Sequence, residues 1–380
     1  MEFTLSPEQQ AIARMVRELM DEQVFPRARE IDEAGVFPEW VRDLFRQYDL
    51  FAAVIPEEYG GIDGSLLTQC VVMEGVARVC ASSSMILGNQ SLGSTPIALA
   101  GSETQKRYWL PLFATGEKLA SFGLTEPGAG SDAKALSTRA EPADGGWVLN
   151  GRKCFITHAN VADLVVVFAK VREGAQDHIT AFLVETDREG YTVDKIEHKM
   201  GLRGSPTCSF VLEDVWIPAD NILGDVGGGF KILVDTLNKG RISVAAQAVG
   251  IAQGALEHSA GYAKERVQFG IPLARMPVIQ QIVADMVTAV ESARCLTWAA
   301  ACKYDSHAAD MVRFSGMAKL YASDTAMKVT TDAVQIMGGY GYMAEYPVER
   351  MMRAAKIFQI FEGTNQVQRL TVAREYFAGR

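Results

Sequence analysis

The sequence lacks an excess of positive charge and a long apolar run. Its 380 residues include 37 Lys and Arg against 46 Asp and Glu, a net charge of −9, so no basic footprint for nucleic acid is present. No uninterrupted apolar stretch approaches the roughly 20 residues of a membrane span. The opening MEFTLSPEQQ has neither a signal-peptide nor a transit-peptide pattern. We therefore expect no nucleic-acid or membrane partner and a cytoplasmic, bacterial-type location; a mature mitochondrial matrix form is also compatible.

Cysteine and proline are scarce. The six cysteines form no CxxC pair, so we expect reduced core thiols and no metal site. With 13 Pro and 34 Gly in a chain that is 48% apolar and 22% charged, collagen-like and disordered classes are excluded. A length of 380 residues predicts two or three domains of an ordinary enzyme.

Three regions with different residue patterns follow one another along the chain, and they predict an α+β multidomain protein. Residues 1–118 are helical in pattern: Ser6, Pro7 and Gln9 form a capping-box signature. A loop is expected at 55–65. The uncharged segment 81–100 is too interrupted by Gly and Ser for a membrane span, so we predict a buried helix.

Residues 119–226 consist of short β-rich runs separated by turn signals such as Gly145-Gly146 and Asn150-Gly151. Without intervening helices, they predict an antiparallel sheet, sandwich or small barrel. Residues 227–380 are helical again. The long Ala-rich stretches 230–268, 276–304 and 310–337 have helical apolar spacing and predict a C-terminal four-helix bundle.

The segment Gly128–Ala133 matches the dinucleotide fingerprint GxGxxA, but its context is wrong. The following residues form a hairpin pattern where a crossover helix is required, and the region offers no parallel sheet. We reject a Rossmann site. An ordinary glycine turn and a glycine loop that approaches a phosphate through its backbone N–H groups both stay open.

Five segments in one order identify a resemblance: LTEPGAGSD at 124–132, FIT at 155–157, ERVQFG at 265–270, QIMGGYGY at 335–342 and IFEGTNQVQRL at 360–370. Together with the α–β–α layout they closely resemble the acyl-CoA dehydrogenase family of flavoproteins over essentially the whole chain. The resemblance implies an enzyme that uses FAD to dehydrogenate an acyl-CoA thioester to the trans-2-enoyl-CoA, or to a cyclic 1-enoyl-CoA.

Glu362 matches the family's catalytic base, which takes the α-proton. Its flanks, including Ile357, Phe358 and Phe361, are largely apolar, so we expect its pKa to rise toward neutrality. Some relatives carry the base before the arginine of the LNKGR segment instead. That position is Gly240 here, so the alternative base is absent.

Other family positions are expected to bind FAD. Among them, the positions that reach the FAD of a neighbouring subunit are Arg266, Gln268, Gln335, Gly338 and Gly339. The expected cofactor-binding residues are Phe122, Leu124, Thr125, Gly130, Ser131, Phe155, Ile156, Thr157, Arg266, Gln268, Phe269, Gln335, Gly338, Gly339, Thr364 and Gln366, with Asn365 also on a family position. The resemblance therefore implies a homo-oligomer, either a dimer or, as is common in the family, a tetramer built as a dimer of dimers.

For substrate binding the resemblance implies Ser131, Asn238, Arg241 and Gly363. The chain departs from the family at Pro277, where relatives often have Gln, at Ala354, where they have Asp, and at Asn238, where many have Asp. Phe155 stands where many relatives have Trp, which keeps aromatic packing without the indole N–H. We expect these changes to alter affinity or substrate fit and to leave the reaction class intact.

The expected acyl group depends on the helix at 81–100. In relatives the 81–100 helix lines the acyl pocket. Here it has no Lys or Arg to pair a dicarboxylic thioester and no Asp or Glu to act as a second base in 1,4-dehydrogenation. Asn89, Gln90 and Ser91 make it polar for a long-chain tunnel, unless they bond to helix 103–114. We expect a short, branched or alicyclic acyl-CoA, and an electron-transfer flavoprotein as acceptor. The alternatives are oxygen-using or non-redox elimination chemistry in the same family.

Overall fold

The computed structural model describes residues 4–62 and 65–379, and it begins with a helical region. The helices are α1 Pro7–Leu19, α2 Ala28–Ala34, α3 Glu39–Gln47, α4 Leu66–Val79, α5 Ala81–Ala100 and α6 Glu103–Ala114. The predicted capping box is confirmed, because the Ser6 hydroxyl accepts the Gln9 N–H at 3.2 Å and the Gln9 amide accepts the Ser6 N–H at 3.1 Å. In the expected 55–65 loop, Glu57–Tyr59 forms a short 3-10 turn, and residues 63–64 lie outside the described part.

The uncharged segment forms the predicted buried helix, α5, which packs against α4, α7 and the first strand. Its polar side chains bond internally. The Gln90 amide donates to the Phe113 and Lys118 carbonyls at 3.1 and 3.0 Å and accepts the Ala120 N–H at 2.9 Å. Asn89 donates to the Ala120 carbonyl at 2.8 Å. These amides therefore tie α5 to the segment that enters the sheet.

The middle region is one sheet with β1 Ala120–Gly123, β2 Arg139–Ala143, β3 Gly146–Thr157, β4 Leu164–Glu173, β5 Gln176–Glu185, β6 Tyr191–Ile196, β7 Thr207–Pro218 and β8 Ile222–Leu223. Their order is β6-β7-β3-β2-β4-β5-β8, with β1 also on β4. The prediction of an antiparallel sheet or barrel was wrong in two respects. Both β1 and β2 pair with β4 in parallel, and the two ends of this order do not pair with each other among the described strands. Hairpin signals report only strands adjacent in sequence, so they carried no information on these distant pairs.

β4 joins the sheet to the helices because it is buried on both faces. Val165 and Val167 point into the core of the sheet region, whereas Val166 and Phe168 pack into the core shared with the helices. The strand therefore reads LVVVFA without the alternation of a half-exposed strand.

The last region is helical, with α7 Gly229–Glu265, α8 Pro277–Asp305, α9 Met311–Met337, α10 Pro347–Phe358 and α11 Asn365–Phe377. The predicted helix 230–268 ends at Glu265. A small hairpin of β9 Val267–Gln268 and β10 Ile271–Pro272 follows, because Phe269 and Gly270 both have positive φ, 52° and 79°, as a tight hairpin turn requires.

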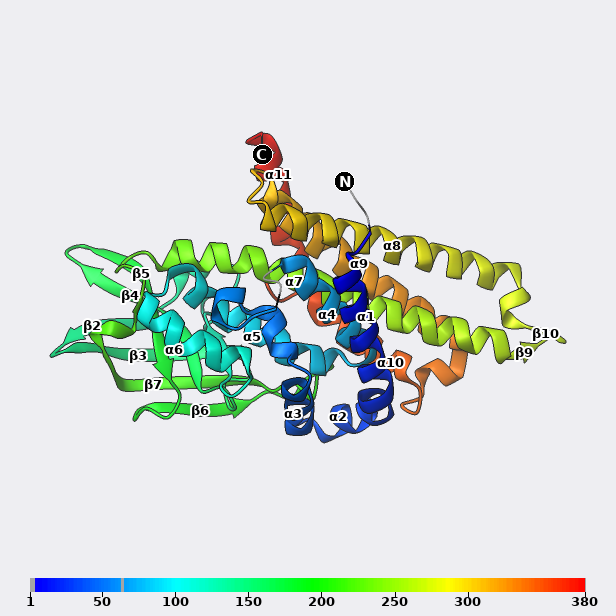
Figure 1. Cartoon of the computed structure of the whole chain (residues 1–380), viewed down its shortest axis with the longest axis horizontal. Helices are drawn as coiled ribbons and strands as arrows, with labels where there is room; N and C mark the ends of the chain where they lie inside the picture. Colours follow the sequence, from blue (N-terminus) through cyan, green and yellow to red (C-terminus); the bar gives the residue numbers. More distant parts are fainter. Residues whose placement is uncertain (1–3, 63–64, 380) are drawn as a thin grey trace.

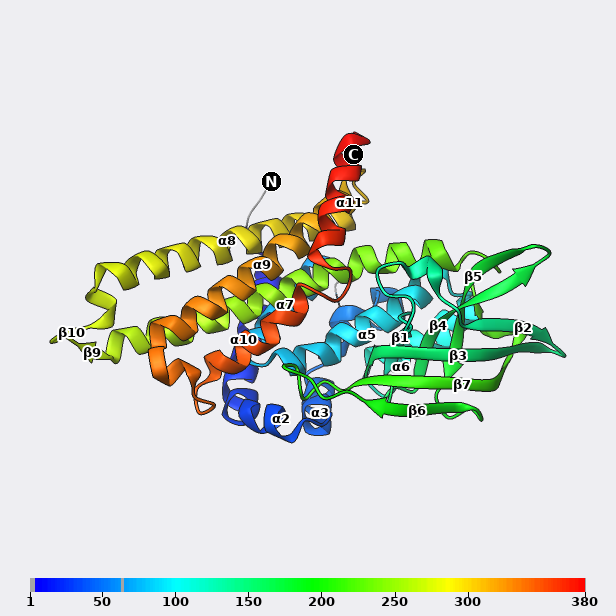
Figure 2. The same cartoon turned by 180° about the vertical axis from the view of Figure 1, so that it is seen from behind.

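The molecule is elongated, with the sheet at one end and the β9–β10 hairpin at the other (Figures 1 and 2). α7 runs along its length and contacts α4, α5, α8, α9 and α10, so both helical regions share one core. Among the described residues, no helix is long and apolar enough to cross a bilayer. Cys295 and Cys302 are exposed on the outer helix α8, so the expectation of core thiols was wrong for these two and holds for the other four.

Candidate functional site

Glu362 lies in the turn between α10 and α11, in a backbone conformation that few residues adopt. Its φ is 56° and that of Gly363 is 89°, two consecutive residues in the left-handed region. The Gln368 amide stabilises the turn by donating to the carbonyls of Glu362 and Gly363 at 3.2 and 3.1 Å. A Cβ at position 363 would lie 2.5 Å from the Gln368 amide nitrogen, so this turn requires glycine there.

Glu362 is half-buried as a residue, and its carboxyl points into the protein. Its Oε2 atom is buried and has no hydrogen-bond partner among the described residues. Burial raises the pKa of Glu362 to about 7, although the nearby Arg241 and Lys319 cations oppose this rise. The direction predicted from its apolar flanks is confirmed, and the value matches a base that works near neutral pH.

Position 240 on α7 faces this carboxyl directly. A Cβ built on Gly240 would lie 3.2 Å from both Glu362 oxygens. The position at which some relatives were expected to carry their base is therefore next to the Glu362 carboxyl. One turn of the helix also carries Asn238 and Arg241, two of the predicted substrate residues. Both are buried, and the Arg241 guanidinium donates to the Asn238 side-chain oxygen at 2.9 Å.

The loop after β1, which was expected to contact the flavin, is held by a buried ion pair. The Lys153 ammonium lies 2.8 Å from a Glu126 carboxylate oxygen, and both side chains are essentially inaccessible. The same carboxylate accepts hydrogen bonds from the backbone and hydroxyl groups of Ser137 and Thr138, at 2.5 to 3.0 Å. Glu126 thus closes the 126–138 loop on itself, and Lys153 attaches it to β3.

Around this anchor, the predicted loop residues differ in exposure. Gly130 and Ser131 are exposed, Leu124 and Thr125 are half-buried, and Phe122 is buried in β1 with its ring 5.0 Å from that of Phe168. The loop therefore presents its glycine and hydroxyl part outward while its first residues pack inside.

A β-bulge in β3 turns Phe155 outward. The register with β7 shifts between Lys153 and Ile156, and Phe155 has a φ of 57° and is 64% exposed. Its neighbours Cys154 and Ile156 are buried and Thr157 is half-buried. The bulge presents a large aromatic ring on the surface beside the loop, since Cys154 donates its N–H to the Thr125 carbonyl at 2.9 Å.

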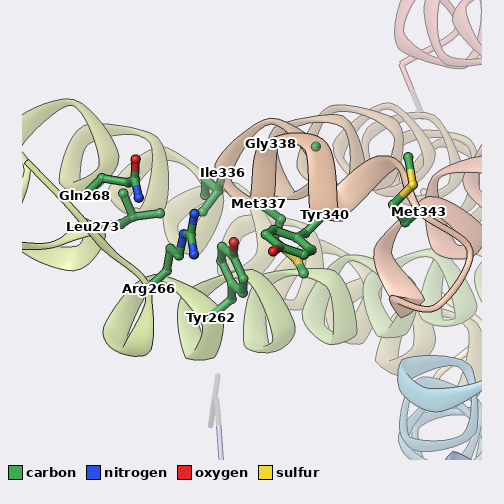
Figure 3. A pocket seen from close by; sticks show the side chains of 10 residues that line it. Tyr262, Arg266, Gln268, Leu273, Ile336, Met337, Gly338, Tyr340 and Met343 are labelled. Atoms are coloured by element: carbon green, nitrogen blue, oxygen red, sulfur yellow. The ribbon is translucent and has the colours of Figure 1, made fainter.

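The second group of predicted residues lies at the opposite end of the molecule (Figure 1). Arg266 and Gln268 line a pocket of about 470 Å³ together with Gly338 and Gly339 from the end of α9 (Figure 3). The Arg266 guanidinium lies 5.5 Å from the centre of the Tyr340 ring in this pocket. Phe269 and Gly270, which form the turn of the β9–β10 hairpin, and Gln335 are also exposed at this end.

The three predicted residues after Glu362 have different surroundings. Thr364 caps α11 by accepting the Val367 N–H at 3.3 Å, and Gln366 is exposed. Asn365 is buried and bonds within the chain, to Lys319, Ser323 and Asp324. Its amide is thus part of the scaffold of the turn.

Sequence reasoning missed four buried polar residues at these places: Glu126, Lys153, Lys319 and Gln368. The available signal for Lys319 was its place in the Ala-rich apolar face of α9, four residues from Ser315 and Ser323. A charged residue at a core position predicts a specific partner.

Two of the positions at which the chain departs from the family have clear surroundings. Pro277 begins α8, and Arg353, next to Ala354, pairs with Glu349 and Asp32, each at 2.7 Å. The described residues contain no cluster of three or more His, Cys, Asp or Glu suited to a metal ion.

Comparisons with known proteins agree with this architecture. The family models for the N-terminal, middle and C-terminal domains of acyl-CoA dehydrogenases match residues 6–117, 121–215 and 227–377. Cyclohex-1-ene-1-carbonyl-CoA dehydrogenase of Geobacter metallireducens is 46% identical over 373 residues, which cover 97% of this chain and 98% of that protein.

Solved structures agree as well. The structure of butyryl-CoA dehydrogenase from Megasphaera elsdenii superposes with a TM-score of 0.96 at 41% identity, covering 99% of this chain and 100% of the other. An acyl-CoA dehydrogenase complexed with FAD from Bacillus anthracis superposes with a TM-score of 0.92 at 35% identity, covering 98% of this chain and 67% of the other. The three domain matches and the near-complete coverage lead to one conclusion: this chain belongs to the acyl-CoA dehydrogenase family of flavoprotein oxidoreductases.

Proposed function

We propose that this enzyme dehydrogenates a short, branched or alicyclic acyl-CoA between Cα and Cβ, with Glu362 as the catalytic base. The observation that carries the proposal is the buried Glu362 carboxyl, whose Oε2 has no hydrogen-bond partner among the described residues and whose pKa is raised to about 7 by burial. A carboxylate with this pKa is a stronger base than an ordinary glutamate and is about half ionised near neutral pH.

The chain offers surroundings that fit FAD. Cβ atoms built on Gly128 and Gly130 meet no atom within 4 Å, so the outward part of the 124–131 loop has room for a bulky group against its backbone. Phe155 supplies an exposed ring next to that loop. When bound, FAD supplies the hydride acceptor, its N5 atom, for the hydride that leaves Cβ. Thr125, Ser131 and Thr157 would hold it from this chain.

Each of several residues of the chain would then have its own role around the thioester. Glu362 takes the α-proton onto a carboxylate oxygen, so that the proton and the hydride leave as a pair and the C–C bond becomes a double bond. The backbone N–H of Glu362 donates to the thioester oxygen and stabilises the charge that develops there, a type of contact worth about 3–4 kcal/mol of barrier. Arg241 and Asn238 lie on the α7 turn beside the base, and Gly363 borders the thioester.

The choice of acyl group rests on the relatives and on α5. A butyryl-CoA dehydrogenase and a dehydrogenase of a cyclohexene carbonyl thioester are both similar over almost the whole chain. α5 carries no Lys or Arg to pair a dicarboxylic substrate and no Asp or Glu to act as a second base. The polarity of Asn89 and Gln90 gives no support, because both amides bond to the backbone around α6 and β1.

We also propose that a neighbouring subunit completes each FAD site in a tetramer, and that an electron-transfer flavoprotein takes the electrons. The Arg266 pocket lies beside the β9–β10 hairpin, at the end of the molecule away from the sheet, whereas Phe155 belongs to strand β3 of that sheet (Figure 1). We therefore expect each group to contact a different FAD. Two copies arranged head to tail would bring Arg266, Gln268, Phe269, Gln335, Gly338 and Gly339 to the FAD of the partner.

The test is an anaerobic visible spectrum of the yellow protein with butyryl-, isobutyryl-, cyclohexanecarboxyl- and palmitoyl-CoA. Bleaching by the shorter or cyclic thioesters is expected. Glu362→Gln should keep the colour and bind the thioester while the rate of bleaching falls by about 10⁴-fold, at the upper end of what a general base contributes. Glu345→Gln, an exposed position, is the matched control. Bleaching of Glu362→Gln at a rate comparable with the unmodified enzyme would reject Glu362 as the base. A yellow protein that no thioester bleaches would favour the non-redox alternative, and rapid reoxidation in air the oxygen-using one.

A further inference from the structure

Lys319 on α9 is a buried cation directly behind the Glu362 turn. The residue is fully buried, yet no carboxylate among the described residues lies within ion-pairing distance of its ammonium. Its Nζ donates to the Gly363 carbonyl at 2.8 Å and to the Asn365 side-chain oxygen at 2.9 Å. A buried ammonium costs free energy unless it is hydrogen-bonded in this way. Its two partners therefore show that Lys319 holds the turn at Gly363 and the start of α11.

The ammonium is held by a network that leaves it little freedom. Asn365 donates to the Ser323 hydroxyl at 2.9 Å and to an Asp324 oxygen at 2.7 Å, which orients its own oxygen toward Lys319. Ser323 in turn donates to the Lys319 backbone carbonyl at 2.7 Å. The cation is therefore fixed with respect to α9 and reaches the turn from a rigid helix.

We propose that Lys319 is a positioning residue for Glu362, holding the left-handed Glu362–Gly363 turn through the Gly363 carbonyl and placing a positive charge behind the carboxylate. The inference rests on the proposed role of Glu362 as the base. Within the described part of the chain, the Lys319 ammonium is the one side chain of α7, α8 or α9 that donates a hydrogen bond to the backbone of Glu362 or Gly363, whereas Gln368 donates from α11.

The Lys319 charge shifts the pKa of Glu362 in a direction that can be measured. The groups that act on Glu362 are Arg241 from α7 and Lys319 from α9; Arg374 of α11 acts on Arg241, and Asp324 of α9 acts on Lys319. Burial raises the pKa of Glu362, and the two cations oppose the rise. Without Lys319 the carboxyl would hold its proton to a higher pH, so the acidic limb of the reduction rate would move upward.

Two variants separate the geometric role from the charge. Lys319→Gln can still donate to the Gly363 carbonyl but has no charge, and Lys319→Met has neither. Lys328→Met, on the same helix but exposed and paired with Asp332, is the matched control. The readout is the rate of anaerobic flavin bleaching by the best thioester of the panel, followed from pH 5 to 9, with FAD retention and thermal unfolding measured on the same holoenzymes.

For Lys319→Gln we expect the midpoint of the acidic limb to rise by about one pH unit, as loss of a nearby opposite charge predicts, with the rate at high pH reduced less than tenfold. For Lys319→Met we expect the same shift and an additional drop of about 100-fold at high pH, the effect of misplacing a reacting group by about 1 Å. The control should match the unmodified enzyme.

An unchanged midpoint in both variants, with FAD retained, would overturn the electrostatic part, and equal rates for Gln and Met at high pH would overturn the positioning part. If the Met variant does not fold, the Gln variant alone decides the charge, and a crystal structure of it decides whether Glu362 keeps its positive φ. Measuring Glu362→Gln alongside separates these outcomes from failure of the base assignment itself, since that failure leaves Glu362→Gln active.

Discussion

Two glutamates with buried carboxyl oxygens, Glu126 and Glu362, have nearly opposite properties although each lies near a buried lysine. For Glu126, burial alone would raise the pKa, but Lys153 and the donors of Ser137 and Thr138 lower it to about 2. For Glu362, burial raises the pKa to about 7 despite Arg241 and Lys319. The two side chains differ in the groups that touch them.

The difference lies in direct hydrogen bonds. The Glu126 oxygens accept from Lys153 and from four groups of two consecutive residues. Glu362 Oε2 accepts none, because Lys319 donates to the backbone of the turn instead. A carboxylate whose lone pairs are all used is a structural anion, whereas one with an unused oxygen near cations can accept a proton.

The largest expected effect on stability comes from breaking the buried ion pair between Glu126 and Lys153. Lys153→Met leaves the Glu126 charge buried without its cation, and we expect the free energy of unfolding to fall by about 3–5 kcal/mol. FAD retention should fall with it, since Leu124 also loses its bond to Lys153. Denaturant unfolding of apoprotein and holoprotein measures both.

The control for that experiment is Lys195→Met, which removes the ion pair of an exposed lysine with the half-buried Glu197 and should cost less than about 1 kcal/mol. Combining Lys153→Met with Glu126→Gln should recover part of the loss, because the buried charge is then gone. A loss below 1 kcal/mol for Lys153→Met alone would show that the pair does not anchor the loop.

The second effect concerns the stability cost of the base. The pKa of Glu362 is raised in the folded state, so folding becomes less favourable as pH rises from the ordinary pKa of 4.5 to about 7, and the penalty persists above that. This shift corresponds to about 3 kcal/mol. Glu362→Gln removes the penalty, so its gain in melting temperature over the unmodified enzyme should be small at pH 5 and largest at pH 8. A gain that is the same at both values would contradict the raised pKa.

The smallest expected effect is that of a single methyl group beside the base. Gly240→Ala places a Cβ 3.2 Å from both Glu362 oxygens, so the carboxyl must move by a few tenths of an ångström. We expect flavin bleaching to slow by about tenfold, a barrier increase of about 1.4 kcal/mol. Gly261→Ala, on the same helix with open space around it, is the control for the gain in helix propensity. Equal rates in the two variants would show that the base tolerates displacement.

Local patterns predicted much of the fold. The capping box at Ser6, the buried helix α5 and the long helices α7, α8 and α9 all follow from spacing and composition within one segment. The parallel pairing of β1 and β2 with β4 did not, because it joins residues with no turn signal between them. The β9–β10 hairpin was missed because its turn uses Phe269 at a positive φ, where glycine or asparagine is usual.

The sequence alone determined the family, the identity of Glu362 as the candidate base and the upward direction of its pKa, since motifs and apolar flanks are properties of short segments. Only the tertiary structure decided how that base is held. Lys319 lies 43 residues from Glu362 in the chain, and Gly240 lies 122 residues away. Their proximity depends on how α7 and α9 pack against the α10–α11 turn, and hydrogen bonds and Coulomb interactions act over a few ångströms of space regardless of separation along the chain.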